Sequence, residues 1–443
     1  MDQLLKKISR NGFRIVLAVS VASFLVAFSY AWHFKIQPSV DARAYDQISW
    51  QIAQGRGYDQ DSSIGRPGPG YEYFLAGIFK LFGHHYQIVW IIQALLLSLS
   101  CLLVYDLARR ATGSLWHPLI GIIAAIFVGF SPDLILSASL LMTEILSVFL
   151  MVATLWVLFI CQEKKNPGLL VASGLILGAL ILTRGNAIFL SIPIGVWLIA
   201  TKRYRDCLII GLTVFLVLTP WTIRNYKVYG IIKPVNGSAG LLYVGNRPGA
   251  TGELDLNYQQ PSGYDFSKMN QLQADTALGE AGRKYILDHP LDFLRLTAIK
   301  ATIYGSFARP FAFWPHLQGV AKKITIFASS LYAALTFLGG VTGLMVWWQR
   351  LKSKKESPEK FLLFLSLAIA LPLSVIWLVV ETRYRFPIYP LLAIGLGVGL
   401  YSYIANGREL AKRWRPILFT TIIMLGITAF DVISNFARIK SKF

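Results

Sequence analysis

Long apolar stretches alternate with short polar loops over most of the chain. A helix needs roughly 17–25 mostly apolar residues to cross the hydrocarbon core of a bilayer. Windows close to this length lie at residues 14–34, 86–108, 117–132, 142–162, 168–183, 186–201, 207–221, 324–348, 361–380, 386–405 and 416–434. The pattern therefore predicts an all-α integral membrane protein with about 11 transmembrane helices.

The first polar stretch, residues 35–85, separates the first two apolar windows. From Asp41 onward, apolar residues recur at helical spacing at Ala44, Ile48 and Ile52, and glycines follow the run. This spacing predicts a surface helix in the first outer loop, with its apolar side on the membrane. The apolar piece at about 71–83 is too short to span, and we expect it to dip into the membrane and return.

The second polar stretch, residues 222–323, is the largest hydrophilic part of the chain. It contains one predicted helix at about 268–287, and we expect it to form a small extracytoplasmic subdomain that leans on the membrane helices. The expected organisation therefore has three parts. They are an N-terminal transmembrane module with the first outer loop (1–221), the extracytoplasmic and interfacial subdomain (222–323) and the C-terminal transmembrane helices (324–443).

The composition agrees with this class, because 55% of the 443 residues are hydrophobic and only 15% are charged. A formal net charge of +20 would also suit a nucleic-acid-binding protein, so the placement of the basic residues decides. Twenty of the 43 lysines and arginines lie in alternate short loops: Lys6, Lys7, Arg10, Arg14, Arg109, Arg110, Lys164, Lys165, Lys202, Arg203, Arg205, Arg350, Lys352, Lys354, Lys355, Lys360, Arg408, Lys412, Arg413 and Arg415. The positive-inside rule explains this asymmetry and excludes nucleic acid as the partner.

By the same rule, the protein is a multi-pass protein of a bacterial-type inner or plasma membrane with a cytoplasmic N-terminus. The cysteines Cys101, Cys161 and Cys207 fall within or at the inner ends of predicted spans, so we expect no disulfide. Neither they nor the six histidines have metal-ligand spacing. We therefore predict no metal site and no certain cofactor, although a divalent metal stays open.

Ionisable residues gather in the loops that this topology places outside. They are Asp41, Asp46, Asp133, Glu144, Arg184, Arg224, Glu381, Arg383 and Arg385. Charged groups at the membrane are energetically costly and are usually functional. The alternative is that they are solvated loop ends that never meet. Taken together, carboxylates that face several arginines indicate a site that activates a hydroxyl and binds a phosphate.

The order of several short motifs supports this interpretation. They are D-A-R-A-Y at 41–45, G-R-G-Y at 55–58, R-P-G-P-G-Y-E-Y-F-L-A at 66–76, M-T-E at 142–144, T-R-G-N at 183–186, P-W-T-I-R-N-Y at 220–226, G-N-R-P-G-A-T-G at 245–252 and R-Y-R-F-P-I-Y-P at 383–390. Over nearly the whole chain this order resembles the GT-C glycosyltransferase superfamily. The similar members are the protein O-mannosyltransferases and the lipid A aminoarabinose transferases.

The resemblance implies a GT-C-type enzyme that moves a hexosyl or pentosyl group from a polyprenyl-phosphate carrier to an acceptor outside the membrane. The acceptor would be a glycan, a lipid or a protein, and membrane lipid surrounds the enzyme. Asp41 resembles the catalytic general base of the family. Glu144 resembles an acidic residue of the second outer loop, and this makes it the second catalytic candidate, in contact with donor or acceptor. Arg383 and Arg385 would bind the carrier phosphate through charge-assisted hydrogen bonds.

Four further residues are weaker substrate-binding candidates: Tyr45, Arg66, Arg184 and Arg224. Asp46 is a further substrate-binding candidate and the alternative base. It lies roughly 140° around the same helix from Asp41, so the two cannot share one pocket.

Structural roles compete with these assignments. Asp41 would also suit an N-cap of the surface helix, and Glu144 would suit the first turn of a span. Arginines at helix ends often extend toward the interface simply to keep their charge in water. A transporter or flippase of lipid-linked sugars is the alternative function. It would be expected to show paired halves with broken helices at mid-depth, and the sequence shows no such pairing. A non-catalytic membrane scaffold would leave the outer carboxylates unexplained.

Overall fold

The computed structural model describes residues 2–58, 68–164, 166–234, 239–255, 258–308, 316–411 and 414–436, and these residues form helices and connecting loops without a strand. The first half contains α1 (Asp2–Phe34), α2 (Asp41–Ala53), α3 (Gly70–Phe82), α4 (Tyr86–Thr112), η1 (Gly113–Leu115), α5 (Pro118–Gly129), α6 (Pro132–Ala138), α7 (Glu144–Lys164), α8 (Pro167–Thr183), η2 (Gly185–Leu190), α9 (Ser191–Ala200) and α10 (Tyr204–Tyr229). The second half contains α11 (Gly240–Gly245), η3 (Phe266–Lys268), α12 (Gln271–Asp288), α13 (Pro290–Gly305), α14 (Gly319–Lys354), α15 (Glu359–Leu373), η4 (Thr382–Ile388), α16 (Tyr389–Ala411) and α17 (Trp414–Ser434).

Six of the described helices are long and apolar enough to cross a membrane, and the bent pair α5 and α6 would make a seventh span. Three shorter apolar helices lie at Pro167–Thr183, Gly185–Ala200 and Leu418–Ser434. Backbone polar groups have no water to bond to in a hydrocarbon core, so helices are the expected spanning elements here. The prediction of an all-α integral membrane protein is confirmed. The exact count of eleven crossings stays a prediction, although each of the eleven windows overlaps a described helix.

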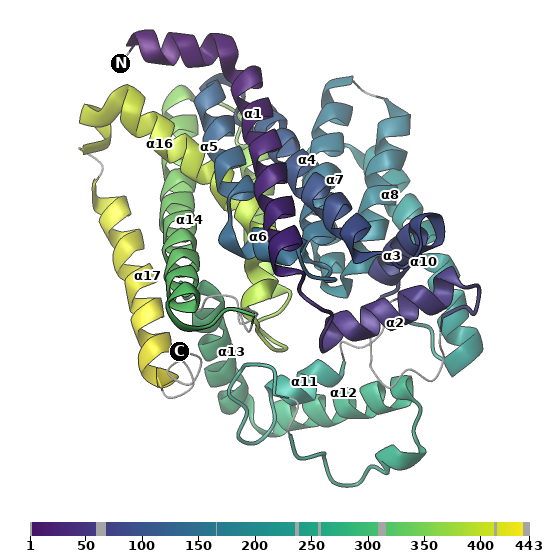
Figure 1. The fold of residues 1–443 in the computed structure, drawn as a ribbon. Coiled ribbons are helices and arrows are strands. Elements are labelled where there is room, and N and C mark those ends of the chain that lie inside the picture. Colours follow the sequence, from purple (N-terminus) through teal and green to yellow (C-terminus); the bar gives the residue numbers. More distant parts are fainter. Residues whose placement is uncertain are drawn as a thin grey trace.

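The long helices run roughly side by side, and α2, α11 and α12 lie across one end of them (Figure 1). We call this end of the bundle the α2 end. Helices α4 and α7 begin there and α8 ends there, so residues at the tips of consecutive helices share this end. The far end carries the C-terminal tips of α4 and α7 and the start of α8.

The predicted helix of the first loop is confirmed as α2, and the short apolar piece after it is α3. The apolar side of α2 does not face the membrane as expected, because Ala44 and Ile48 are buried within the protein, where α2 packs on α3. The start of α3 packs against the end of α8 at a backbone separation that only glycine permits. A Cβ on Gly68 would lie 2.2 Å from the carbonyl oxygen of Leu182, and one on Gly70 would lie 2.6 Å from the amide nitrogen of Thr183. Gly68 and Gly70 therefore fix the start of α3 against α8.

The predicted helix at 268–287 is confirmed as α12. It begins with a capping box, in which the Asn270 side chain accepts from the Gln273 amide and the Gln273 side chain accepts from the Asn270 amide, both at 2.9 Å. This arrangement satisfies backbone donors that the first turn leaves unpaired. Together with α11 and α13, α12 forms the layer that covers the α2 end.

Helices α14 and α16 make the most extensive contact between two helices of the described chain, and glycines allow it. A Cβ on Gly343 of α14 would lie 1.7 Å from the carbonyl oxygen of Gly395 in α16. Small residues at such positions let helix backbones approach closely in a membrane protein.

We predict that Gly343→Ala lowers the melting temperature of the detergent-purified protein by several degrees. The added methyl overlaps backbone, and overpacking of this kind costs about 1–3 kcal/mol. Gly211→Ala is the matched control, because a Cβ there meets nothing within 4 Å and alanine favours helix. Equal melting temperatures for Gly343→Ala and the parent would contradict the close packing.

Candidate active site

An acid–arginine cluster lies at the α2 end and is centred on Arg383 of η4. One guanidinium nitrogen of Arg383 donates to Asp41 Oδ2 at 2.9 Å, and its Nε donates to Glu381. The same Nε lies 4.0 Å from Glu144 Oε1. Three carboxylates from three distant parts of the chain thus surround one cation.

A second arginine joins this cluster from the end of α8. Nη1 of Arg184 lies 3.8 Å from Glu144 Oε1, and Glu144 itself is only 1% exposed. The ring of Tyr384 lies 5.1 Å from the Arg184 guanidinium and 5.9 Å from that of Arg383. The aromatic face therefore stabilises both cations, and the two arginines compensate the buried carboxylate.

Asp41 is the first residue of α2, and the backbone before it has an uncommon conformation. The N-cap position belongs to Val40, whose φ of 48° and ψ of −118° lie outside the usual regions for a β-branched residue. Val40 makes no side-chain cap, and the Asp41 carboxylate bonds to Arg383 instead. The interpretation of Asp41 as an N-cap is therefore wrong.

The segment that precedes Arg383 is held by the layer that covers the α2 end. Asn246 donates to the Trp377 carbonyl at 2.9 Å, and the Val380 amide donates to the Gly252 carbonyl at 3.0 Å. Lys300 of α13 is fully buried and donates to Asn246 Oδ1 at 2.6 Å. These contacts join the covering layer to residues 377–380, which lead directly into the cluster.

Asp46 has hydrogen-bond partners outside the cluster. Asp46 accepts hydrogen bonds from Tyr86 at 2.8 Å and pairs with His84 at 2.7 Å, so it joins α2 to the start of α4. Tyr45 packs edge-on against Tyr71, with ring centroids 5.1 Å apart. Asp41 and Asp46 thus have different hydrogen-bond partners.

Arg385 also lies elsewhere, although it is only two residues from Arg383. It is 1% exposed, and it donates to the Tyr389 hydroxyl at 3.0 Å and to the Ser306 carbonyl at 2.7 Å. Tyr389 in turn donates to Asp133 Oδ2 at 3.1 Å. Arg385 and Asp133 thus belong to a buried network in the helical core.

Arg224 stands at the end of α10 among aromatic rings. Its guanidinium lies 4.7 Å from the Trp221 ring centroid, 5.0 Å from that of Tyr229 and 5.2 Å from that of Tyr58. Arg224 is therefore placed beside the end of the first-loop helix rather than within the acid–arginine cluster. Arg66 lies outside the described residues.

A sequence profile of the family described as dolichyl-phosphate-mannose-protein mannosyltransferase matches residues 66–223, which is less than half of the chain. No curated protein sequence matches the chain at a significant level.

Several solved structures are similar over nearly the whole chain. The apo crystal structure of the Archaeoglobus fulgidus oligosaccharyltransferase matches with a TM-score of 0.55 and 14% identity, over 96% of this chain and 56% of that one. AglB from the same organism, in complex with an inhibitory peptide and a dolichol-phosphate, matches with a TM-score of 0.51 and 12% identity, over 96% and 55%. Apo ArnT from Cupriavidus metallidurans matches with a TM-score of 0.51 and 15% identity, over 96% and 73%.

The chain has the GT-C fold. It spans little more than half the length of the oligosaccharyltransferase that it matches. The expected resemblance to the GT-C superfamily is confirmed, and at these identities it establishes the fold.

Two members of the cluster have no individual role in the sequence prediction. Glu381 was noted at the outer face without a role, and Tyr384 stands between the two arginines of R-Y-R. The signal available for Glu381 was its spacing of two residues from Arg383. Within the described part of the chain, no group of three or more His, Cys, Asp or Glu side chains is placed to hold a metal ion.

The buried Lys300 predicts a measurable pH dependence of stability. Burial lowers the pKa of Lys300 to about 7, whereas an unfolded lysine has a pKa of roughly 10.4. Between these values the unfolded chain binds the additional proton, so stability rises with pH. Below pH 7 both states are protonated and this term is constant.

We therefore expect the melting temperature of the parent to rise relative to Lys300→Met between pH 7 and pH 10. Thermal unfolding of both proteins in the same detergent at each pH checks this. Lys284→Met removes an exposed lysine from α12. Its melting temperature should differ from that of the parent by the same amount at every pH. If the difference in melting temperature between Lys300→Met and the parent also stays constant with pH, the amine of Lys300 is not neutral in the folded protein.

Proposed function

We propose that this protein is a glycosyltransferase that moves a sugar from a polyprenyl-phosphate carrier to an acceptor hydroxyl, with Asp41 as the general base. The observation that carries the proposal is the Asp41–Arg383 pair, at 2.9 Å, within a cluster of acids and arginines at one end of an apolar helical bundle. A carrier lipid needs a site at the membrane boundary, and its phosphate needs counter-charge. The cluster supplies both.

Asp41 and Arg383 differ in exposure, and this suits different roles. The Asp41 side chain is 36% exposed, so an acceptor is able to reach it, whereas the Arg383 side chain is only 11% exposed. In the proposed step, Asp41 takes the proton of the acceptor hydroxyl while the hydroxyl oxygen bonds to the anomeric carbon of the sugar. The bond from that carbon to the phosphate oxygen breaks, and the carrier phosphate leaves with the electron pair. Because a phosphate is a good leaving group, no general acid is required.

Arg383 and Arg184 are the proposed phosphate ligands. Glu144 lies close to both arginines through its Oε1. Its Oε2 is buried without a hydrogen-bond partner in the described structure, and so is Arg184 Nη1. Buried polar atoms normally have partners, so substrate or water is expected to complete the site. A neighbour of the same fold, AglB, has a solved structure in complex with a dolichol-phosphate, which supports a lipid-phosphate carrier here. Arg385 is assigned to the helical core, and Arg66 and Arg224 stay proposals for the edge of the donor site.

The side of the membrane follows from charge. Basic residues concentrate at the far end, for example at Arg109, Arg110, Lys202 and Arg205, and the positive-inside rule then places the far end in the cytoplasm. The α2 end is thereby proposed to be extracytoplasmic, with the subdomain at 222–323 over it. The three-part organisation and the eleven crossings belong to this same proposal. The transferred group is proposed to be a hexose or a pentose, and the acceptor a glycan, lipid or protein.

Replacing the proposed base tests the mechanism. Asp41→Asn should lower the rate of sugar transfer by about 100-fold or more, because general bases contribute roughly 10²–10⁴ to rate. The measurement is the release of carrier phosphate from a defined polyprenyl-phosphate hexose by purified protein, with membrane extract as the source of acceptor. Unchanged transfer by Asp41→Asn would remove Asp41 from the reaction.

Asp46→Asn is the companion variant on the same helix. Its carboxylate bonds to His84 and Tyr86, so we expect a lower melting temperature with turnover kept in the folded fraction. If transfer instead disappears in Asp46→Asn and persists in Asp41→Asn, the base is Asp46. A transporter would translocate the lipid-linked sugar without releasing carrier phosphate in either protein.

The role of Arg383 has a different kinetic signature. Arg383→Gln should raise the apparent KM for the donor at least tenfold, since a charge-assisted contact to phosphate is lost. Arg383→Lys keeps the charge but loses the paired donors of the planar guanidinium. Its KM for the donor should therefore lie between those of the parent and Arg383→Gln. Donor KM and kcat that match the parent in Arg383→Gln would exclude a contact between Arg383 and the carrier phosphate.

A further inference from the structure

A cavity of about 420 Å³ lies at the far end of the bundle, between the end of α7 and the starts of α8 and α10. Its lining consists of Cys161, Gln162, Pro167, Leu170, Arg203, Arg205 and Asp206. Cys161 follows Glu144 on the same helix by a distance of about 25 Å, at the α-helical rise per residue. The cavity is therefore separate from the acid–arginine cluster.

The polar part of the lining is cationic and partly unsatisfied. Arg203 is held in place by a hydrogen bond from its Nε to Asp206 at 2.7 Å, and its guanidinium lies 5.5 Å from the Trp197 ring centroid. Its Nη1 is buried and has no hydrogen-bond partner in the described structure, and the same is true of Gln162 Oε1. Arg205 is exposed at the rim. Two guanidiniums against one carboxylate leave the cavity with a net positive charge.

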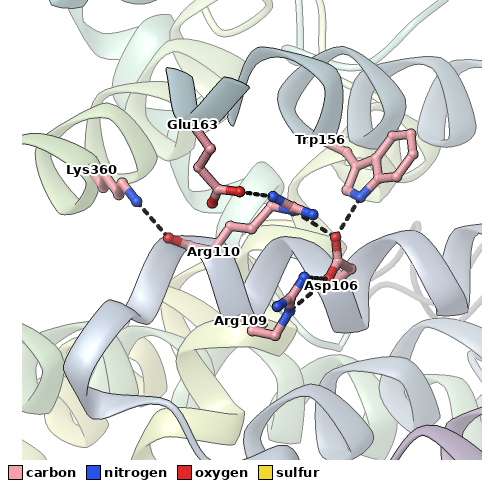
Figure 2. A network of polar contacts seen from close by, with 6 residues as sticks. All are labelled: Asp106, Arg109, Arg110, Trp156, Glu163 and Lys360. Atoms are coloured by element: carbon pink, nitrogen blue, oxygen red, sulfur yellow. Dashed lines mark hydrogen bonds and ion pairs between the residues drawn. The ribbon is translucent and has the colours of Figure 1, made fainter. Parts of the chain in front are cut away.

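In a neighbouring network at the same end, by contrast, the arginines are bonded to carboxylates. Figure 2 shows Arg109 and Arg110 both bonded to Asp106, which also accepts from the Trp156 indole at 2.8 Å. Arg110 contacts Glu163 as well. Both arginines there are bonded to carboxylates, and Lys360 donates to the Arg110 carbonyl at 2.8 Å. In the cavity beside this network, Arg203 Nη1 has no hydrogen-bond partner in the described structure. An anion is thus better accommodated at the cavity than at the network of Figure 2.

The surface that continues from the cavity is apolar. Along α10, Leu208, Leu212 and Phe215 recur at helical spacing on the outside of the bundle and are 62%, 53% and 65% exposed. Helix α10 is among the helices that are long and apolar enough to span a membrane, so this stripe faces hydrocarbon. A ligand that combines a phosphate with acyl chains would match the cavity and the stripe together.

We propose that this cavity binds the phosphodiester headgroup of an anionic phospholipid, with Arg203 and Arg205 on the phosphate and the acyl chains along α10. The placement of arginines at the end of a span agrees with lipid recognition by basic pockets between membrane helices. The proposal does not depend on the glycosyltransferase function, because it concerns the other end of the bundle.

Native mass spectrometry of the detergent-purified full chain tests this site with phosphatidylglycerol as the probe. We expect the parent to bind the first phosphatidylglycerol molecule more tightly than phosphatidylcholine with the same acyl chains. Arg205→Gln should weaken that first binding event by about fivefold, which corresponds to about 1 kcal/mol per basic residue at the membrane surface. Arg205 is exposed, so folding is not at risk.

The matched control is Lys202→Gln, which removes one exposed charge from the same turn but does not line the cavity. It should leave the first binding event unchanged. Equal weakening in both variants would show a general attraction of anions to this end and overturn the proposal. Equal binding of the two lipids would overturn it too. Competition by inorganic phosphate as strong as that by phosphatidylglycerol would show that the cavity does not select a lipid.

Discussion

Burial of charge at the α2 end is the constraint on which the rest of this structure depends. Taking an ion out of water costs several kcal/mol unless an opposite charge compensates it. Arg383 meets this requirement by pairing with Asp41 at 2.9 Å and by lying close to Glu144 and Glu381. These partners come from α2, α7 and the loop before η4. The ends of three distant segments therefore have to meet for any of these charges to be tolerated.

Close backbone packing brings those segments to the same place. Glycines at 68 and 70 seat α3 on the end of α8, which carries Arg184. Asn246 and Lys300 hold the segment that leads into η4, through the Trp377 carbonyl. A change in either contact would shift an arginine of the cluster relative to Asp41. Positioning of this accuracy matters for catalysis, because small displacements from the reacting geometry reduce rate strongly.

The sequence predicted those features that depend on local pattern. Hydrophobic length predicted the helical membrane architecture, helical spacing predicted α2, and position at the ends of apolar windows indicated Asp41, Glu144, Arg184 and Arg383. It failed to separate Arg383 from Arg385, because the direction of each side chain on η4 is set by tertiary partners. Arg385 turns to Tyr389 and the Ser306 carbonyl. Likewise, nothing local to Asp46 shows that His84 and Tyr86 would engage it.

The bilayer restricts the backbone, and this restriction determines where the acid–arginine cluster and the far-end cavity lie. In hydrocarbon every peptide group has to be bonded within its own helix, so irregular backbone is confined to helix ends. The strained Val40, the non-helical segment before Arg383 and the turn that carries Arg203 all occur there. Charged side chains are presented from these same segments, because only there are water and phosphate within reach. A helical membrane protein of this kind therefore has two separate places for polar chemistry, and the acid–arginine cluster and the far-end cavity occupy one each.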